Sequence, residues 1–287
     1  MIIKFLSVVL LPAFGAIAGC AAVTMQKSEL TNNNLNSTLW IQSSSEYKAN
    51  SIQTFNSARN ILNRAQNEVL WTAVSEQGVE YSTLPTAIIL DIDETVLDNS
   101  PYQAQLVLNG REYDYESWDK WVALKSASAV PGSVDFINYA QKQGIEIFYI
   151  TNRACAPRIQ DGEPCPQEQD TIENLRNVGI TGVTPNNTLL KKERPDWTSE
   201  KGSRRKAVTM NYRVIMLFGD DLGDFLPDVK QSITTQERDL LVAKHKENWG
   251  TKWFTLANPT YGSWLSILES PKSAQLRGVQ SAEQTGE

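Results

Sequence analysis

Hydrophobic residues follow two different patterns along this chain. Between about residues 46 and 75 they recur every three or four positions, which predicts one long amphipathic helix or two. Farther on they form short continuous runs rich in β-branched residues, at 87–90, 145–150, 214–218 and 253–256. Helical segments are expected between these runs, at 132–143, 167–178 and 201–211. Apolar strands that alternate with helices are typical of a parallel sheet covered on both faces.

The pattern therefore predicts an α/β fold, a Rossmann-like doubly wound parallel sheet with an N-terminal helical extension. Residues 98–131 break the alternation and are rich in tyrosine and tryptophan. We expect them to form a small helical insertion, or cap, between the first two strands. In open α/β sheets, ligands bind beyond the carboxyl ends of the strands. The polar residues that follow each strand are therefore the candidates for chemistry.

The N-terminus has the features of an export signal. A basic start at residues 1–4 precedes an apolar run at 5–18 that is too short to span a bilayer comfortably. The run leads into Gly19-Cys20, which resembles the lipobox of bacterial lipoproteins, where the signal is removed and the cysteine carries lipid. Ala21 follows, rather than the aspartate that suggests inner-membrane retention. We expect a lipid anchor on Cys20 in the bacterial cell envelope, at the outer membrane; an ordinary signal peptide with an incidental cysteine is the alternative.

Composition divides the chain into four parts. We expect a signal peptide at 1–19, a polar tether at 20–44, the main domain at 45–269 and a polar, mobile tail at 270–287.

The formal net charge is -6, so a nucleic-acid polymer held by general electrostatic attraction is not expected as a partner. The single histidine, His245, excludes zinc sites and catalytic mechanisms that need several histidines.

Two cysteines besides Cys20 remain, Cys155 and Cys165. An exported domain lies in an oxidising compartment, where cysteines pair. The ten-residue spacing reads as a short loop that closes easily, so we predict a disulfide. Two free thiols are the alternative.

The strongest chemical signal follows the first strand. Asp91 and Asp93 lie two residues apart at the strand end, so both carboxylates can face one site. One can attack a phosphorus atom while the other transfers protons. A calcium loop would need glycine and glutamate where this chain has Val96 and Tyr102, so that alternative fails. Solvated acids at a strand end are the remaining alternative.

Polar groups also close two later strands. Thr151 and Asn152 offer a hydroxyl, an amide and backbone N–H groups that can hold phosphate oxygens, although both residue types also favour turns. Asp220, Asp221 and Asp224 place three carboxylates in five residues, and such a cluster needs a cation or solvent between its charges. Ligands that are all oxygen favour Mg²⁺, and a solvated acidic loop is the alternative.

Taken in order, Asp-x-Asp-x-Thr, then Thr, then Lys, then Gly-Asp-x-x-x-Asp resembles the four motifs of haloacid dehalogenase-like phosphatases. More narrowly, residues 46–266 resemble the bacterial lipoprotein e acid phosphatases, the class C, 5′-nucleotidase-like family. The segments that carry the narrower resemblance are 91–100, 118–121, 130–132, 149–153, 219–225 and 258–264.

The resemblance implies a role for each matching residue. Asp91 would be the nucleophile that forms an aspartyl-phosphate, and Asp93 would protonate the leaving oxygen and then activate water. Mg²⁺ would bind the Asp91 carboxylate, the Asp93 backbone carbonyl and Asp220, with Asp224 supporting these ligands. Thr151 would hold the phosphate. The family often has asparagine at the position after Asp220.

The catalytic lysine and the leaving-group site are the less direct assignments. A basic stretch contains two candidates, of which we choose Lys201 because its Lys-x-x-Arg context matches the family; Lys206 is the second choice. Trp118 and Tyr261 would flank the leaving group, which predicts nucleoside 5′-monophosphates as substrates. Alternatively, Trp118, Trp121 and Tyr261 are all core residues, because aromatic residues at helical spacing usually are; Trp118 and Trp121 are three positions apart and could share one buried face.

Two other functions stay open at this point. One is a phosphomonoesterase or phosphotransferase without nucleotide preference. The other is a surface-binding lipoprotein that kept the fold without catalysis. The presence of Asp91, Asp93, Thr151, Asp220 and Asp224 disfavours it.

Overall fold

The computed structural model describes residues 33–158 and 162–278. The predicted signal peptide, the lipidation site Cys20 and the first part of the tether lie outside the described residues. In the described part, no helix combines the length and the apolar composition needed to cross a membrane.

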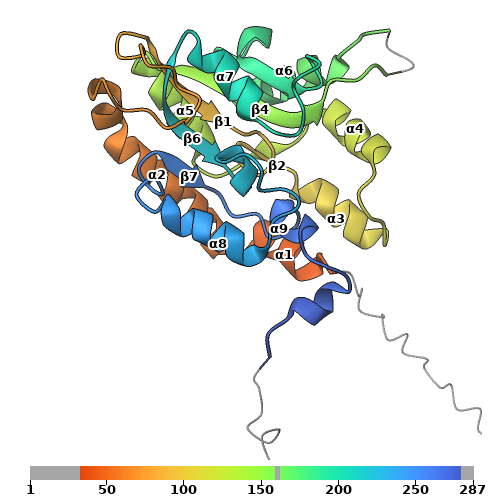
Figure 1. Ribbon diagram of the computed structural model, residues 1–287. Coiled ribbons are helices and arrows are strands. Elements are labelled where there is room, and N and C mark those ends of the chain that lie inside the picture. The colour runs from red at the N-terminus through yellow and green to blue at the C-terminus, as the bar shows by residue number, and fades with distance from the viewer. Residues whose placement is uncertain (1–32, 159–161, 279–287) are drawn as a thin grey trace, which may run out of the picture.

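A five-stranded parallel sheet forms the centre of the domain (Figure 1). Its spatial order is β5 (Thr188–Lys191), β4 (Glu146–Ala154), β1 (Thr86–Leu90), β6 (Arg213–Gly219) and β7 (Trp253–Thr255). The chain builds outward from β1 through β4 to β5, then returns to the other side of β1 for β6 and β7. This reversal places a topological switch point at the carboxyl end of β1, where open α/β sheets bind ligands.

The strands are apolar because both faces of the sheet are covered. Every residue of β1 and β6 is buried. Alternate β1 side chains enter different clusters: Ile88 and Leu90 enter one, and Ala87 and Ile89 enter the other. In the first cluster the ring of Phe55 stacks on that of Phe218, with centroids 5.4 Å apart. The predicted α/β fold with a parallel sheet is thus confirmed.

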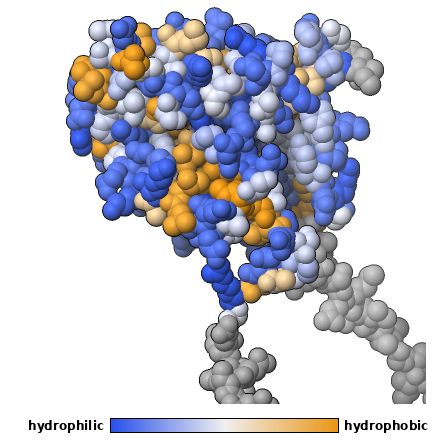
Figure 2. All heavy atoms as spheres, in the orientation of Figure 1, coloured by the Kyte–Doolittle hydropathy of each residue, from blue (hydrophilic) through white to orange (hydrophobic). Residues whose placement is uncertain are grey.

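Helices from separate parts of the chain supply the two covering layers. The long helix α2 (Ser45–Asn67) and α5 (Ser133–Lys142) contribute to the first cluster, and α7 (Gly202–Thr209) contributes to the second. The other elements outside the cap are α6 (Pro166–Asn177), α8 (Thr235–Lys244), α9 (Ser263–Ser266) and the short 3₁₀ turns η1 (Pro185–Asn187), η2 (Leu222–Asp224) and η3 (Lys272–Gln275). Figure 2 shows hydrophilic side chains over much of one face, with an apolar area around α8, where Leu240 and Val242 are exposed.

The insertion after β1 contains two helices. The short antiparallel strands β2 (Leu97–Asp98) and β3 (Ser128–Ala129) pair at its base. Between them lie α3 (Ser100–Leu108) and α4 (Tyr115–Leu124), which we call the cap (Figure 1). The Asp114 carboxylate accepts a hydrogen bond from the Ser117 N–H at 2.8 Å, so α4 begins at a regular N-cap.

The N-terminal boundary differs from the prediction. Residues 35–43, which the polar composition assigned to the tether, form helix α1 (Leu35–Ser43). Thr38 and Ile41 of α1 are buried, and α1 packs against α3 and α2. Tertiary contact therefore orders a segment whose composition resembles that of a linker.

Candidate active site

The carboxyl ends of three adjacent strands bring the predicted chemical residues together. Asp91 directly follows β1, Thr151 lies near the end of β4, and Asp220 directly follows β6. The Asp91 N–H donates to the Phe218 carbonyl at 2.9 Å, which continues the sheet pairing up to the site.

Three carboxylates and one ammonium group form the centre of this site. Carboxylate oxygens of Asp91, Asp220 and Asp224 all lie within 4.8 Å of one another. Lys201 Nζ donates to Asp91 Oδ1 and lies 2.7 Å from Asp224 Oδ1, and its side chain is only 4% exposed. Lys201 directly precedes α7, whereas Lys206 lies in the last turn of that helix and is exposed. The structure therefore places Lys201, and not Lys206, among the acids.

The charges in this cluster are incompletely compensated. Burial raises the pKa of Asp91 to about 7, although Lys201 opposes the shift, and nearby Asp224 adds to it. Burial, followed by the charges of Asp91 and Asp224, raises the pKa of Asp220 well above its ordinary value. Burial alone would lower the pKa of Lys201, but Asp224 and Asp91 raise it, so its ammonium stays charged. One lysine balances one of the three acids, and a divalent cation would balance the other two.

Neighbouring side chains hold Asp220 in place. Asn258, in the loop after β7, donates to Asp220 Oδ2 at 2.8 Å, and Thr95 donates to Asp220 Oδ1 at 3.3 Å. Neither residue was predicted to have a role, although Thr95 and Asn258 both lie in segments that carry the family resemblance. Gly219 permits the approach of Asp224, because a Cβ there would lie 2.2 Å from Asp224 Oδ2.

Asp221 turns away from the acid cluster. Its carboxylate accepts hydrogen bonds from the backbone N–H of Ser263, from the Ser263 hydroxyl at 2.8 Å and from the Gly223 N–H at 2.8 Å. These hydrogen bonds overcome the effect of burial and hold the pKa of Asp221 below its usual value. The acid at this position therefore ties η2 to α9 instead of adding charge to the site.

Asp93 is surrounded by hydrogen-bond donors. Arg153 donates to Asp93 Oδ1 from Nη2 at 2.8 Å and from Nε at 3.1 Å. Asn99 Nδ2 donates to the same oxygen at 3.0 Å, and the Thr151 hydroxyl donates to Oδ2 at 3.3 Å. Sequence reasoning missed Arg153 and Asn99; their only signal was that both lie within the segments that resemble the family.

Asn152 has a different position from the one expected. Its Nδ2 donates to the Ser199 carbonyl at 3.1 Å, and its Oδ1 accepts from Arg204 Nη2 at 2.7 Å. These bonds connect the end of β4 to the segment that carries Lys201. The structure thus places the Asn152 amide in support of the lysine, whereas a phosphate contact was predicted.

The cap and the last strand end supply aromatic groups. The Trp118 ring is half-buried, makes an edge contact with Tyr102 at 5.2 Å between centroids, and lies 5.8 Å from Arg153 Cζ. Trp121 instead turns its Nε1 inward and donates to Asn99 Oδ1 at 2.8 Å. The two tryptophans of α4 therefore approach Asp93 differently: Trp121 hydrogen-bonds Asn99, whereas the Trp118 ring lies near Arg153.

Tyr261 is connected to a buried carboxyl group. Its hydroxyl donates to Glu94 Oε2, and the Asn99 N–H donates to Glu94 Oε1 at 2.9 Å. Burial, followed by the charge of Asp93, raises the pKa of Glu94 well above its ordinary value. Glu94 thereby links Tyr261 to the residues around Asp93.

With this geometry in view, comparison with known proteins decides the family. The sequence model of the HAD superfamily, subfamily IIIB (acid phosphatase) matches residues 15–264. The chain belongs to this acid phosphatase family. The predicted family and the predicted enzyme class, a phosphoric monoester hydrolase, are confirmed.

Solved structures agree with the phosphatase assignment. The class C acid phosphatase from Bacillus anthracis is 35% identical, with a TM-score of 0.68 and coverage of 82% of this chain and 87% of that one. A second structure of that enzyme, with tungstate bound, is 32% identical, with a TM-score of 0.70 and coverage of 86% and 98%.

Curated relatives match over shorter stretches. Acid phosphatase 1 of Solanum lycopersicum is 29% identical over 143 residues, which is 48% of this chain and 51% of the tomato protein. The class B acid phosphatase of Aggregatibacter actinomycetemcomitans is 27% identical, over 68% of this chain and 75% of that protein. The chain thus matches about half the length of the tomato relative.

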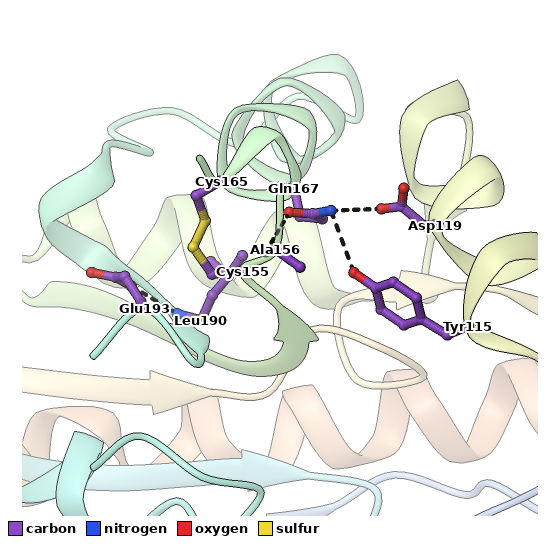
Figure 3. Close-up of a disulfide and its surroundings, with 8 residues drawn as sticks. All are labelled: Tyr115, Asp119, Cys155, Ala156, Cys165, Gln167, Leu190 and Glu193. Carbon is purple, nitrogen blue, oxygen red and sulfur yellow. Dashed lines mark hydrogen bonds between the residues drawn. A yellow bond between two sulfur atoms is a disulfide. The ribbon is translucent and has the colours of Figure 1, made fainter. Parts of the chain in front are cut away.

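The phosphatase carries the predicted disulfide, which joins Cys155 to Cys165 (Figure 3). It connects the residue that follows β4 to the residue before α6. Gln167 lies beside it, accepts from the Ala156 N–H at 3.1 Å and donates to Asp119 Oδ1 on α4 at 2.8 Å. The disulfide-bonded segment therefore contacts the cap.

An arginine strengthens the same contact. Arg158 donates from Nε and Nη2 to the two Asp119 oxygens at 2.6 and 2.9 Å, and from Nη1 to Asp170 at 2.6 Å. Asp119 directly follows Trp118 in α4. The ion pairs thus fix the helix turn that carries Trp118.

Proposed function

We propose that this phosphatase hydrolyses phosphomonoesters through an aspartyl-phosphate on Asp91, with nucleoside 5′-monophosphates as preferred substrates. The observation that carries the proposal is the position of Asp91. Its carboxylate lies at the switch point of the sheet, bonded to Lys201 and next to the buried Asp224 and the half-buried Asp220.

The chain's own residues account for both halves of the reaction. An Asp91 oxygen attacks phosphorus as the ester P–O bond breaks, and Asp93 gives its proton to the departing oxygen. Asp93 then takes a proton from water, which attacks the same phosphorus and releases Asp91 and inorganic phosphate. Lys201 offsets the negative charge of the nucleophile and of the incoming phosphate.

The acid cluster fits a hard divalent cation, and we assign Mg²⁺. Its oxygen-only ligands and uncompensated charge suit this ion. Asp91, Asp220 and the Asp93 carbonyl would hold it, with Asp224 in support. When bound, the ion would neutralise phosphate oxygens and polarise the phosphoryl group.

Selectivity comes from groups that touch the leaving group, because every substrate shares the phosphate. Trp118 and Tyr261 offer two aromatic rings that can hold a nucleobase, at about 1–3 kcal/mol per stacked base. Stacking accepts any base, so the preference would cover nucleoside 5′-monophosphates in general. Without this contact the chain would be a general phosphomonoesterase or phosphotransferase.

One experiment tests this function. Purified protein is given a panel of nucleotides, sugar phosphates and an aryl phosphate, with and without EDTA, beside Asp91→Asn. We expect metal-dependent release of phosphate, fastest from nucleotides, and a loss of several orders of magnitude in kcat for the variant. Activity of Asp91→Asn within tenfold of wild type would contradict the mechanism. No hydrolysis of any substrate would favour a binding lipoprotein.

We also propose that the phosphatase is lipid-anchored through Cys20 in the bacterial outer membrane. The support is the apolar run that ends in Gly19-Cys20-Ala21, outside the described residues. Metabolic labelling with a fatty acid should label the wild type and not Cys20→Ser. Fractionation would then place the labelled protein in the outer or the inner membrane.

A further inference from the structure

The buried side chain of Arg153 directly contacts Asp93, the proposed proton donor. Its side chain is 1% exposed and that of Asp93 is 15% exposed, so the arginine is enclosed by protein while the carboxylate keeps some contact with solvent. The third guanidinium nitrogen, Nη1, donates to the Thr171 hydroxyl of α6 at 3.2 Å. The plane of the guanidinium group is therefore held from two sides, by a helix and by the carboxylate.

This contact constrains orientation. Nη2 donates to Asp93 Oδ1, and Nε is shared between Oδ1 at 3.1 Å and Oδ2 at 3.3 Å. Because the planar arginine donors contact both oxygens, they allow only a narrow set of carboxylate orientations. Asn99 restricts the same oxygen from another direction and is itself held by Trp121. A proton donor must lie within about 2.6–3.2 Å of its acceptor, so such restriction bears directly on catalysis.

Arg153 also approaches the cap. The Trp118 ring centroid lies 5.8 Å from Arg153 Cζ, within reach of a cation–π contact. The arginine thus contacts both the carboxylate proposed to protonate the leaving oxygen and the ring proposed to hold the leaving group.

We propose that Arg153 is a positioning residue that aims the Asp93 carboxyl group at the leaving-group oxygen. This inference rests on the proposed function, since it assumes that Asp93 delivers that proton. The Arg153 side chain donates to Asp93 and Thr171 and not to Asp91, so it would act through Asp93. Its loss should therefore slow only the reactions that need the proton.

Leaving groups separate this role from a general structural one. A phenolate with a nitro group departs without a proton, whereas an unsubstituted phenolate or an alkoxide needs one. The parameter kcat/KM reports the steps up to departure of the leaving group and is insensitive to the later hydrolysis of the aspartyl-phosphate. A series of aryl phosphates of similar size therefore measures proton delivery alone.

The test compares Arg153→Met and Arg153→Lys with wild type across this series. We expect Arg153→Met to lose roughly a hundredfold in kcat/KM on phenyl phosphate and less than about threefold on 4-nitrophenyl phosphate, since general acid catalysis contributes about 10²–10⁴. Arg153→Lys keeps the charge without the paired donors and should recover only part of the loss. An equal loss along the series, or full recovery by lysine, would overturn the proposal.

A matched control is available at the other end of the sheet. Arg213 begins β6, is 3% exposed, and donates to the carbonyls of Glu68 at 2.8 Å and Gln66 at 2.7 Å. Arg213→Lys should lower the Tm without changing the dependence on leaving group. If Arg213→Lys steepens that dependence as Arg153→Met does, the effect is one of stability and the proposal fails.

A double-mutant cycle checks that the arginine acts through the aspartate. Asp93→Asn should steepen the dependence on leaving group, and adding Arg153→Met should steepen it no further, because both changes remove the same step. Additive effects would overturn the proposal. Asp91→Asn in the same assay separates the two hypotheses. If it stays active, the proposed function fails; if it is inactive while Arg153→Met loses activity uniformly, only the positioning role fails.

Discussion

Lys201 Nζ lies 2.7 Å from Oδ1 of Asp224 and also donates to Asp91, so one buried ammonium bridges acids from two different strand ends. Its replacement would leave three carboxylates without their internal counter-charge.

We therefore expect Lys201→Met to lower kcat by at least about a hundredfold, a loss typical of a group that stabilises charge in the transition state. Lys206→Met serves as the matched control, because Lys206 lies on the same helix and is exposed. Its kcat should stay near the wild-type value. Steady-state kinetics on an aryl phosphate measures both, and an inactive Lys206→Met beside an active Lys201→Met would reverse the assignment.

Metal binding should stabilise the phosphatase more as the pH rises. Burial raises the pKa of Asp91 to about 7 and that of Asp220 well above its usual value. Because these folded-state values exceed the unfolded ones, the contribution of these two acids to the stability of the metal-free protein is largest where both are protonated and is lost as the pH rises through the folded values. Mg²⁺ replaces those protons, so the rise in Tm on adding Mg²⁺ should be larger near pH 7.5 than near pH 5.

Two adjacent acids provide the control for this measurement. Asp220→Asn should reduce the Mg²⁺-induced rise in Tm, because Asp220 belongs to the cluster. Asp221→Asn should preserve the rise, since Asp221 bonds Ser263 and Gly223 instead. A Mg²⁺ effect that does not depend on pH or on Asp220 would place the ion elsewhere.

Loss of the Trp118 ring should lower the hydrolysis of nucleotides more than that of small substrates. We expect Trp118→Ala to lower kcat/KM for nucleoside 5′-monophosphates by roughly ten- to a hundredfold, through loss of base stacking. A small aryl or alkyl phosphate should change much less, and Trp118→Phe, which keeps a ring, should retain part of the preference. Equal losses on both substrate types would make Trp118 a structural residue of the cap.

The disulfide should contribute to stability and to the position of the cap. Cys155 and Cys165 are ten residues apart, and closing a loop of this size stabilises a fold by about 2–3 kcal/mol. We expect the double variant Cys155→Ser/Cys165→Ser to lose this much free energy of unfolding, as measured by urea denaturation. Because Gln167 and Arg158 connect this segment to Asp119, KM for nucleotides should rise more than KM for a small aryl phosphate. Asp119→Asn, with the disulfide intact, should reproduce the effect on KM with a smaller loss of stability.

The amino-acid sequence by itself determined the sheet and the ends of its strands. Continuous apolar runs such as the one before Asp91 are recognisable without a structure, because a strand buried on both faces needs apolar residues at every position. The acids that follow the runs were also evident, since parallel strands bring their carboxyl ends to one edge. Composition was a weaker guide at residues 35–43, where contacts with α3 and α2, and not local preference, order helix α1.

Only the tertiary structure decided which side chains meet. Lys201 and Lys206 belong to one basic segment, and the choice between them depends on contact with Asp91, which is 110 residues away from Lys201. Likewise, Arg153 reaches Asp93 across 60 residues, and neither the spacing nor the residue type indicated the pair. The physical reason is that burial patterns and turns are local properties of a sequence, whereas an ion pair forms only where the packing of β1, β4 and α7 brings distant segments together.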